Sequence, residues 1–270
     1  MQSKFIPDYT EEDSEHWYLN TETGARVPSV TTIFSILKKP WLERWKTKEA
    51  INYIVETGDH DVDMALMASK KKGEIATTIG SNVHNTIEVY LKEWLKNKAR
   101  PKKRLVHYMY PDFKVDPTTH LRYDQIGLQT IAGLRSAEKL FDQYEDVFEP
   151  VAVEICVGDV QHKYGGKLDL LCKFNGKLEL WDWKTSVAIP LTEAEYPMQA
   201  NGYRRAFEKE HKIKVSKIRI IQLSKFEDKF TLYEVEKSAD LVKSFYALAK
   251  YYDTIITNNE RYYREIRRSD

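Results

Sequence analysis

Two aspartates and a lysine in the middle of the chain are the residues best suited to chemistry. Asp182 precedes Lys184 by two positions, and Asp169 lies upstream of both. Carboxylates supply the oxygen ligands that hard divalent cations prefer. An ammonium group can hold an attacking water or stabilise negative charge on a phosphate. Brought together, these three side chains would suit metal-assisted hydrolysis of a phosphodiester bond.

The dipeptide Asn175-Gly176 predicts a tight β-hairpin that would bring the two aspartates together, because alternating apolar residues flank it. The register of a two-residue turn places Asp169 opposite Asp182. Directly opposed side chains have Cβ atoms about 5 Å apart, and like charges there are destabilising, so a shared cation is expected. Lys184 lies on the same strand face as Asp182, since strand side chains alternate. The alternative is a solvated strand face with Asp169 at a turn.

Three short strands are expected between Val151 and Ser186, and the hairpin provides the last two. Glu154, in the first strand, is expected to point away from Val153 and Ile155. It could add a further acid to the site, or it could be a surface residue.

A long amphipathic helix is expected upstream, from Ile75 to about Lys96, after a separate helical region from about Val62 to Lys72. His84 and Glu88 are one turn apart on a face that borders the apolar stripe. A single histidine beside such a stripe is commonly packed in the core, and neutral imidazole is also a good ligand for Mn²⁺.

Downstream of the hairpin, a helix is expected from about Glu193 to Lys209. It carries Gln199 and Tyr203 one turn apart, followed by Arg204. Tyr203 reads as a core residue from the pattern alone. The remaining elements expected are strands at Lys217–Leu223 and Thr231–Val235 and a helix at about Ala239–Thr257.

The N-terminal region is expected to form a β-hairpin between Phe5 and Val27 and then a helix that reaches Leu37. Ser29 or Thr31 would cap this helix, although hydroxyl groups at a helix start, including that of Thr32, can also bind a phosphate. A second helix begins at Pro40. Its Trp41 and Trp45 share one face, either as core residues or as a platform for unpaired bases.

Basic residues gather in two places along the chain. Lys70 begins a run of three lysines that either ends a helix in solvent or contacts phosphate. The stretch 98–125 is basic and Pro-interrupted at its start, which predicts a loop insertion before a helix at about Leu128–Phe148.

The motifs taken together resemble the PD-(D/E)XK nuclease superfamily. Asp169 and the sequence Asp182-Trp183-Lys184-Thr185 are similar to its signature. The segment 80–84 with Glu88, and the pair Gln199 and Tyr203, are similar to the histidine and QxxxY motifs of its RecB-type branch. The segment PSVTTI at 28–33 resembles one in the mitochondrial genome maintenance exonuclease and in phage-encoded relatives.

This resemblance implies roles for individual residues. His84, Asp169, Asp182 and the carbonyl of Trp183 would bind Mg²⁺ or Mn²⁺, while Lys184, Gln199 and Glu154 would complete the catalytic group. DNA contacts are implied for a further set of residues: Ser29, Thr31, Thr32, Lys70, Thr185, Tyr203 and Arg204.

The expected fold is α/β, with a mixed central sheet flanked by helices as in restriction endonucleases and a mainly helical N-terminal part. Residues 1–74 would form an N-terminal region that contributes to a DNA groove. Residues 75–260 would form the nuclease core, and residues 261–270 a basic tail.

The net charge, the cysteine count and the hydropathy of the chain exclude several classes of protein. The net charge of +1 excludes a globally basic nucleic-acid binder, so that a DNA surface would be a local groove. The chain has two cysteines, which cannot hold a four-cysteine iron–sulfur cluster and indicate a reducing compartment. No apolar run is long enough for a membrane span and no signal peptide is evident. The expected location is therefore the cytoplasm, which for a phage-encoded protein would be that of the host cell.

The resemblance therefore implies a metal-dependent DNA exonuclease that acts on single-stranded DNA or on DNA ends in replication, recombination or repair and leaves 5′-phosphates. Two alternatives stay open: an endonuclease with the same chemistry, and a noncatalytic protein that binds DNA ends. No sequence feature sets the polarity of digestion, the number of metals, the oligomeric state or the protein partners.

Overall fold

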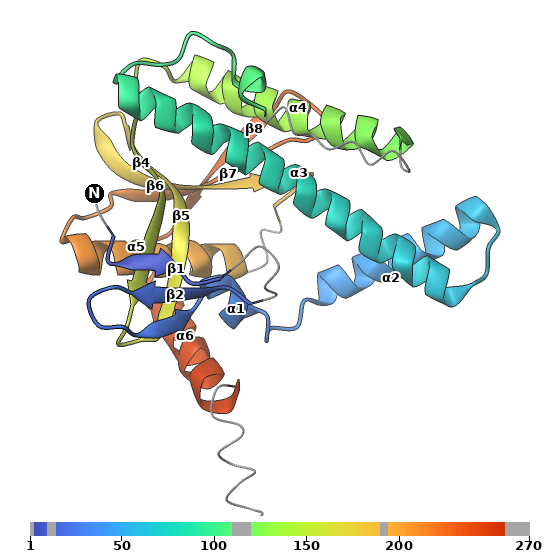
Figure 1. Cartoon of the computed structure of the whole chain (residues 1–270), viewed down its shortest axis with the longest axis horizontal. Helices are drawn as coiled ribbons and strands as arrows, with labels where there is room; N and C mark the ends of the chain where they lie inside the picture. The colour runs from blue at the N-terminus through green and yellow to red at the C-terminus, as the bar shows by residue number, and fades with distance from the viewer. Residues whose placement is uncertain (1–2, 10–14, 110–119, 190–193, 257–270) are drawn as a thin grey trace, which may run out of the picture.

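A mixed five-stranded sheet forms the centre of the molecule in the computed structural model, which describes residues 3–9, 15–109, 120–189 and 194–256 (Figure 1). The strand order is β4-β5-β6-β7-β8. β6 and β7 are parallel, and α5 supplies the crossover that a parallel pair needs. The strand bounds are β4 Phe148–Asp159, β5 Tyr164–Phe174, β6 Lys177–Thr185, β7 Lys217–Leu223 and β8 Phe230–Val235.

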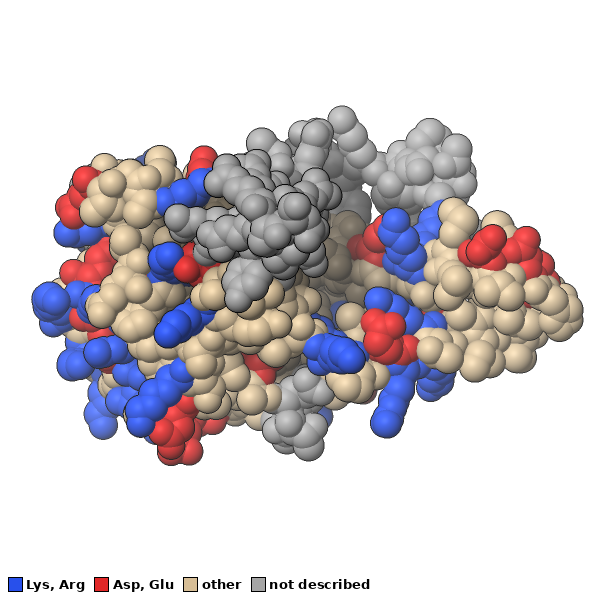
Figure 2. Space-filling model, turned by 90° about the horizontal axis from the view of Figure 1, so that it is seen from below, with Lys and Arg blue, Asp and Glu red and all other residues tan. Residues whose placement is uncertain are grey.

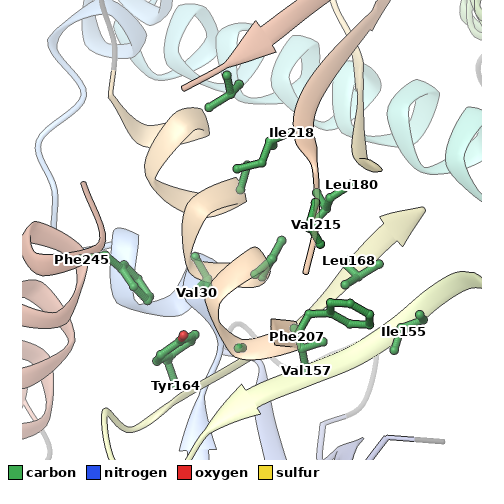
Figure 3. Close-up of a cluster of buried hydrophobic side chains, with 14 of the residues drawn as sticks. Val30, Ile155, Val157, Tyr164, Leu168, Leu180, Phe207, Val215, Ile218 and Phe245 are labelled. Carbon is green, nitrogen blue, oxygen red and sulfur yellow. The ribbon is translucent and has the colours of Figure 1, made fainter. Parts of the chain in front are cut away.

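Each face of this sheet is covered by helices. On one face, α1 (Val30–Phe34), α5 (Glu195–His211) and α6 (Ala239–Tyr251) bury an apolar cluster, part of which appears in Figure 3. The labelled members come from both layers, with Leu168, Leu180 and Ile218 on the strands opposite Phe207 on α5. On the other face, α3 (Val62–Asn97) and α4 (His120–Gln143) cover an aromatic cluster around Trp181 and Trp183. The α/β fold with a restriction-endonuclease-like core is therefore confirmed.

The longest helix, α3, runs across the molecule and corrects the prediction of two helices at 62–72 and 75–96. Asp61 caps its N-terminus by accepting from the N–H groups of Asp63 and Met64, and the helix continues without a break through Gly73. One glycine costs only about 1 kcal/mol in a helix, too little to interrupt one that packs along its length. The expected boundary between residues 74 and 75 thus falls inside a continuous helix.

The N-terminal strands form a three-stranded antiparallel sheet rather than a single hairpin, with β1 at Phe5–Pro7, β2 at Trp17–Asn20 and β3 at Arg26–Pro28. Then α2 (Pro40–Thr57) pairs with the first turns of α3 to form an arm that projects from the body (Figure 1). α2 buries no residue. Trp41 is 42% exposed and Trp45 is partly exposed, so the expected core packing of this pair is wrong.

Other bounds differ modestly from expectation. β4 begins at Phe148 instead of Val151, and α1 ends at Phe34 before reaching Leu37. The stretch 98–109 contains a 3-10 turn, η1 (Leu105–Tyr108), while α4 begins at His120, earlier than expected. α6 ends at Tyr251 and continues as the π-helical turn η2 (Tyr252–Ile256). The basic tail 261–270 lies outside the described residues.

Charge is interspersed on the surface. Figure 2 shows basic and acidic side chains intermixed over the face that it presents. None of the described helices combines the length and the apolar character needed to cross a membrane.

Candidate active site

The β5–β6 hairpin has the predicted register. Pairing runs from Phe174 with Lys177 to Leu170 with Trp181. Asn175 and Gly176 both have positive φ, at 50° and 72°, as a tight hairpin turn of this type requires.

The regular pairing stops one position before Asp169 and Asp182. There the Trp183 N–H donates to Asp169 Oδ2 at 2.8 Å, so that a side chain takes the place of a ladder bond. The Asp169 side chain is 14% exposed, and its pKa is raised first by partial burial and then by the negative charge of Asp182. The two carboxylates are therefore electrostatic neighbours.

Glu154 marks a local change of strand face that simple alternation does not predict. Its φ is +54°, which is a left-handed conformation uncommon for a residue with a side chain. Val153 packs against the α3–α4 cluster and Ile155 against the α5 cluster. The expectation that both neighbours point to one side is therefore wrong.

The same change of face occurs on β5, between Leu168 on the α5 side and Leu170 on the α3–α4 side. These irregularities oppose each other and create a gap in the β4–β5 ladder. Glu154 and Asp169 flank this gap. The pKa of Glu154 is raised first by burial and next by Asp169.

Lys184 lies at the centre of the polar cluster. Its Nζ is 2.6 Å from Asp182 Oδ2 and donates to Gln199 Oε1 at 3.3 Å. It also lies 4.8 Å from the centre of the Tyr196 ring. Burial lowers the pKa of Lys184, but Asp182 and Asp169 outweigh this effect and the net shift is upward. Lys184 is therefore an ammonium at neutral pH, suited to stabilising negative charge rather than to removing a proton.

His84 reaches the cluster from α3. Its Nδ1 is 3.7 Å from Asp169 Oδ2. The pKa of His84 is lowered by burial first and then by the charge of Lys184. The imidazole is therefore neutral at neutral pH, which is the form that binds metals. Glu88, one turn further along α3, forms an ion pair with Lys92.

Two residues of the cluster were missed by the sequence analysis. Lys167 Nζ lies 2.5 Å from Glu154 Oε2, and Tyr196 packs under Lys184. Strand alternation could have found Lys167, which is two residues before Asp169. No comparable signal marks Tyr196, because its helix brings it to Lys184 only through the tertiary fold.

The hydroxyl groups of the PSVTTI segment are used within the fold. Ser29 Oγ accepts from the Thr32 N–H at 2.9 Å and so caps α1, as expected. Thr32 Oγ1 accepts from the His16 N–H at 2.9 Å and donates to the His16 carbonyl at 3.1 Å. Both side chains are buried, so these contacts leave them no free group for a phosphate. Thr31 is exposed.

On α5, the two side chains expected to contact DNA, Tyr203 and Arg204, already contact other side chains of the protein. Tyr203 is 5% exposed, and its hydroxyl accepts from Gln199 Nε2 at 3.1 Å. It packs so closely against Gly166 that a Cβ there would lie 2.3 Å from the ring. Arg204 forms an ion pair with buried Glu208 at 2.9 Å. The geometry thus makes Tyr203 a support for Gln199 and Arg204 a structural residue.

The other two side chains expected to contact DNA differ in exposure, since that of Lys70 is exposed and the hydroxyl of Thr185 is buried. Lys70, on the arm, has a side chain 79% exposed and lies 3.9 Å from Glu74. Thr185 follows Lys184 on β6, and its Oγ1 is buried with no hydrogen-bond partner among the described residues.

The donors present fit a hard divalent cation by type. Three carboxylates (Glu154, Asp169, Asp182) outnumber two ammonium groups (Lys167, Lys184), and buried Asp182 Oδ2 has Lys184 Nζ at 2.6 Å as its partner among the described residues. Over the part of the chain that the structure describes, no three His, Cys, Asp or Glu side chains already lie close enough to hold a metal. Lys184 occupies one side of Asp182, and the Trp183 N–H occupies one oxygen of Asp169. A cation would therefore compete with Lys184 for Asp182.

Among comparisons with known proteins, one identifies a family. A solved structure described as "Crystal structure of SSO0001" is 16% identical in sequence, with 81% of this chain and 87% of that chain covered, but its TM-score of 0.30 does not establish a shared fold. No curated protein matches the chain. The family model of the PD-(D/E)XK nuclease superfamily matches residues 62–269, which include every residue of the polar cluster. The chain belongs to the PD-(D/E)XK nuclease superfamily.

Proposed function

We propose that this chain is a metal-dependent deoxyribonuclease of the RecB-type branch, an exonuclease that acts on single-stranded DNA or on DNA ends. The observation that carries the proposal is the excess of buried carboxylates around Lys184, with the pKa values of Asp169 and Glu154 both raised. Buried like charges destabilise a fold unless a cation joins them. Membership of the nuclease superfamily makes DNA the expected substrate.

In this proposal, His84, Asp169, Asp182 and the Trp183 carbonyl hold Mg²⁺ or Mn²⁺. The bound ion would lower the pKa of a water and offset charge on the phosphate. Lys184 positions that water and stabilises the negative charge that develops at phosphorus. Gln199 holds Lys184 in place and is itself held by Tyr203. The water oxygen bonds to phosphorus as the P–O3′ bond breaks, and the proton that the water loses is balanced by one that the leaving 3′ oxygen takes up from solvent. The products are a 5′-phosphate and a 3′-hydroxyl.

Glu154 has a separate place in the proposal. Its ion pair with Lys167 keeps a second ammonium beside the carboxylates. We assign Glu154 a supporting role, in which it aligns Lys167 near the incoming phosphate.

The test is a cleavage assay with purified protein and Mn²⁺ or Mg²⁺. The substrates are linear single strands, linear duplexes and covalently closed single-stranded circles, with each linear substrate labelled at one end. An exonuclease degrades the linear substrates and leaves the circle intact. Cleavage of the circle would indicate an endonuclease, and no degradation of any DNA would indicate a noncatalytic end-binding protein.

A further inference from the structure

A groove of about 690 Å³ lies between α4 and the turn that joins β7 to β8, outside the candidate active site. Figure 1 shows α4 beside these two strands. Leu128 and Arg135 line the groove from α4, and Lys225, Phe226 and Asp228 line it from the turn. The groove therefore combines apolar surface with two cations and one acid.

The two cations of the groove have no carboxylate partner. Neither Arg135 nor Lys225 forms an ion pair with any other described residue, a property that they share with many other basic residues, and the Lys225 ammonium lies 5.9 Å from the centre of the Phe226 ring. Burial alone lowers the pKa of Lys225, with no carboxylate to offset it. An anion bound in the groove would stabilise the charged form of this partly buried lysine.

Phe226 is 62% exposed although its turn is firmly held. Ser224 Oγ accepts from the N–H groups of Phe226 and Glu227 at 3.3 and 3.1 Å. Ser136 on α4 accepts from the Lys229 N–H at 3.0 Å, and its hydroxyl lies 3.1 and 3.0 Å from the carbonyls of Ser224 and Glu227. The aromatic ring is thus presented to solvent by a fixed loop.

The groove lies at the carboxyl end of β7, next to the end of β6 that carries Lys184. Lys184 pairs with Gln222 on β7, and Lys225 follows Gln222 by three residues, past the end of the strand at Leu223. Three residues span at most about 10 Å and neighbouring strands lie about 5 Å apart, so the backbones at Lys184 and Lys225 lie within about 15 Å of each other. The Lys184 side chain faces α5, whereas Thr185 faces α4, since a Cβ on Gly133 would be 3.6 Å from Thr185 Cγ2. A strand that joins the two sites would therefore pass over the ends of β6 and β7.

We propose that the groove binds single-stranded DNA next to the scissile phosphate, with an unpaired base stacked on Phe226 and backbone phosphates at Lys225 and Arg135. This inference rests on the proposed nuclease function. Stacking on an exposed ring requires an unpaired base, and unpaired cations fit phosphates better than they fit a peptide backbone. Asp228 repels phosphate and so favours the side of the groove formed by Arg135 and Lys225.

The test measures binding of fluorescein-labelled oligo(dT) in EDTA by anisotropy over a range of KCl concentrations. Phe226→Ala should weaken binding by about 5- to 150-fold, and Phe226→Trp should restore it. The double variant Arg135→Ala with Lys225→Ala should reduce the salt slope by about 1.4, or 0.7 for each lost phosphate contact. Ile213→Ala and Lys173→Ala, an exposed apolar residue and an exposed lysine elsewhere, should bind as the unmodified chain does.

An oligonucleotide with abasic positions separates stacking from a general loss of folding. Phe226→Ala and the unmodified chain should bind this oligonucleotide equally. If the unmodified chain cleaves DNA but both groove variants bind oligo(dT) with unchanged affinity and salt slope, the groove is not a DNA site and a protein partner becomes its better occupant. If the unmodified chain binds oligo(dT) through Phe226 but cleaves no DNA under any metal, the groove assignment stands and the proposed catalysis fails.

Discussion

Strand β6 carries two buried carboxylates, Glu179 and Asp182, whose surroundings are opposite in kind. Glu179 is saturated, since it accepts from Trp181 Nε1 at 2.9 Å and from Arg219 Nε at 2.7 Å. Asp182 shares its pocket with Asp169, and its Oδ2 has an ion pair but no hydrogen bond from a described residue. The charge of Glu179 is therefore neutralised within the fold by Arg219, whereas the cluster around Asp182 has an excess of negative charge.

This difference distinguishes a buried charge that stabilises the fold from a buried charge that is available for function. A closed pair such as Glu179–Arg219 needs nothing from outside, so removing one partner leaves a buried charge without compensation. A crowded acidic cluster lacks positive charge within the fold, so that a cation can bind it with a gain in free energy. Ser29 and Thr32 are like the closed pair in this respect. They belong to a segment that resembles a functional motif, but their hydrogen bonds to each other and to His16 satisfy them within the fold, so their role is structural.

The largest effect on stability is expected at the closed pair. Glu179→Gln should lower the free energy of unfolding by about 3 kcal/mol, at the low end for a broken buried pair because Arg219 keeps a contact of 3.8 Å with Glu234. Asp169→Asn should leave stability unchanged or raise it at pH 8 without metal, because it removes a charge that burial disfavours. Urea unfolding of both variants measures the contrast, with exposed Glu149→Gln on β4 as the control. An equal loss in the two variants would contradict the comparison.

The largest effect on activity is expected at the crowded cluster. Lys184→Ala should lower kcat by at least about 100-fold, the scale for removing one group that stabilises transition-state charge. Lys173→Ala, an exposed lysine on the neighbouring strand β5, should cleave at the unmodified rate. Single-turnover cleavage with saturating Mn²⁺ gives the rates, and circular dichroism checks that the variant is folded. Unchanged turnover would remove Lys184 from the mechanism.

Metal binding should stabilise the crowded cluster and leave the closed pair unaffected. A cation at 100 times its dissociation constant raises the free energy of unfolding by about 2.7 kcal/mol. Thermal unfolding with increasing Mn²⁺ should therefore show a rising Tm in the unmodified chain and in Glu179→Gln. Asp169→Asn should show little or no rise, since a ligand has been lost. A rise of the same size in Asp169→Asn would place the metal elsewhere.

The hairpin could be predicted to the residue because its causes are local. The preference of Asn175-Gly176 for a two-residue turn determines which residues pair across the hairpin. The alternation of side chains along a strand then places Asp182 and Lys184 on the same face. The helix of His84 was equally clear from its apolar stripe, although its full length was not. Asp61 caps the start of α3, but the continuation of the helix through Gly73 depends on packing against α2, α4 and the sheet.

What could not be predicted depends on contacts between distant segments. The change of face at Glu154 and Asp169 arises where β4 and β5 must cover two different cores, and no local pattern marks it. The same holds for Tyr196 beneath Lys184 and for Arg204, which is paired with Glu208 inside the fold. Resemblance supplied candidate residues, while their availability for DNA depended on tertiary partners.

The smallest and most specific difference is expected in the pH dependence of stability. The folded pKa of Asp169 lies above its unfolded value, so the folded state holds the proton more tightly. Without metal, the contribution of Asp169 to stability is therefore fully present below about pH 4, the unfolded value, and is lost as the pH rises toward the folded pKa, by at most about 1.4 kcal/mol per pH unit. Glu154 contributes in the same direction.

Two variants isolate this effect, measured as the free energy of unfolding in urea from pH 4 to pH 8 in EDTA. In Asp169→Asn, the fall with rising pH should be smaller than in the unmodified chain. Glu234→Gln tests the opposite sign, because Lys217 lowers the pKa of Glu234 and the stability that Glu234 contributes is lost as the pH falls. Mn²⁺ should reverse the trend of the unmodified chain, since metal binding requires deprotonated carboxylates. If the metal-free chain instead gained stability relative to Asp169→Asn as the pH rose, the cluster would resemble the closed pair at Glu179, and its need for a cation would disappear.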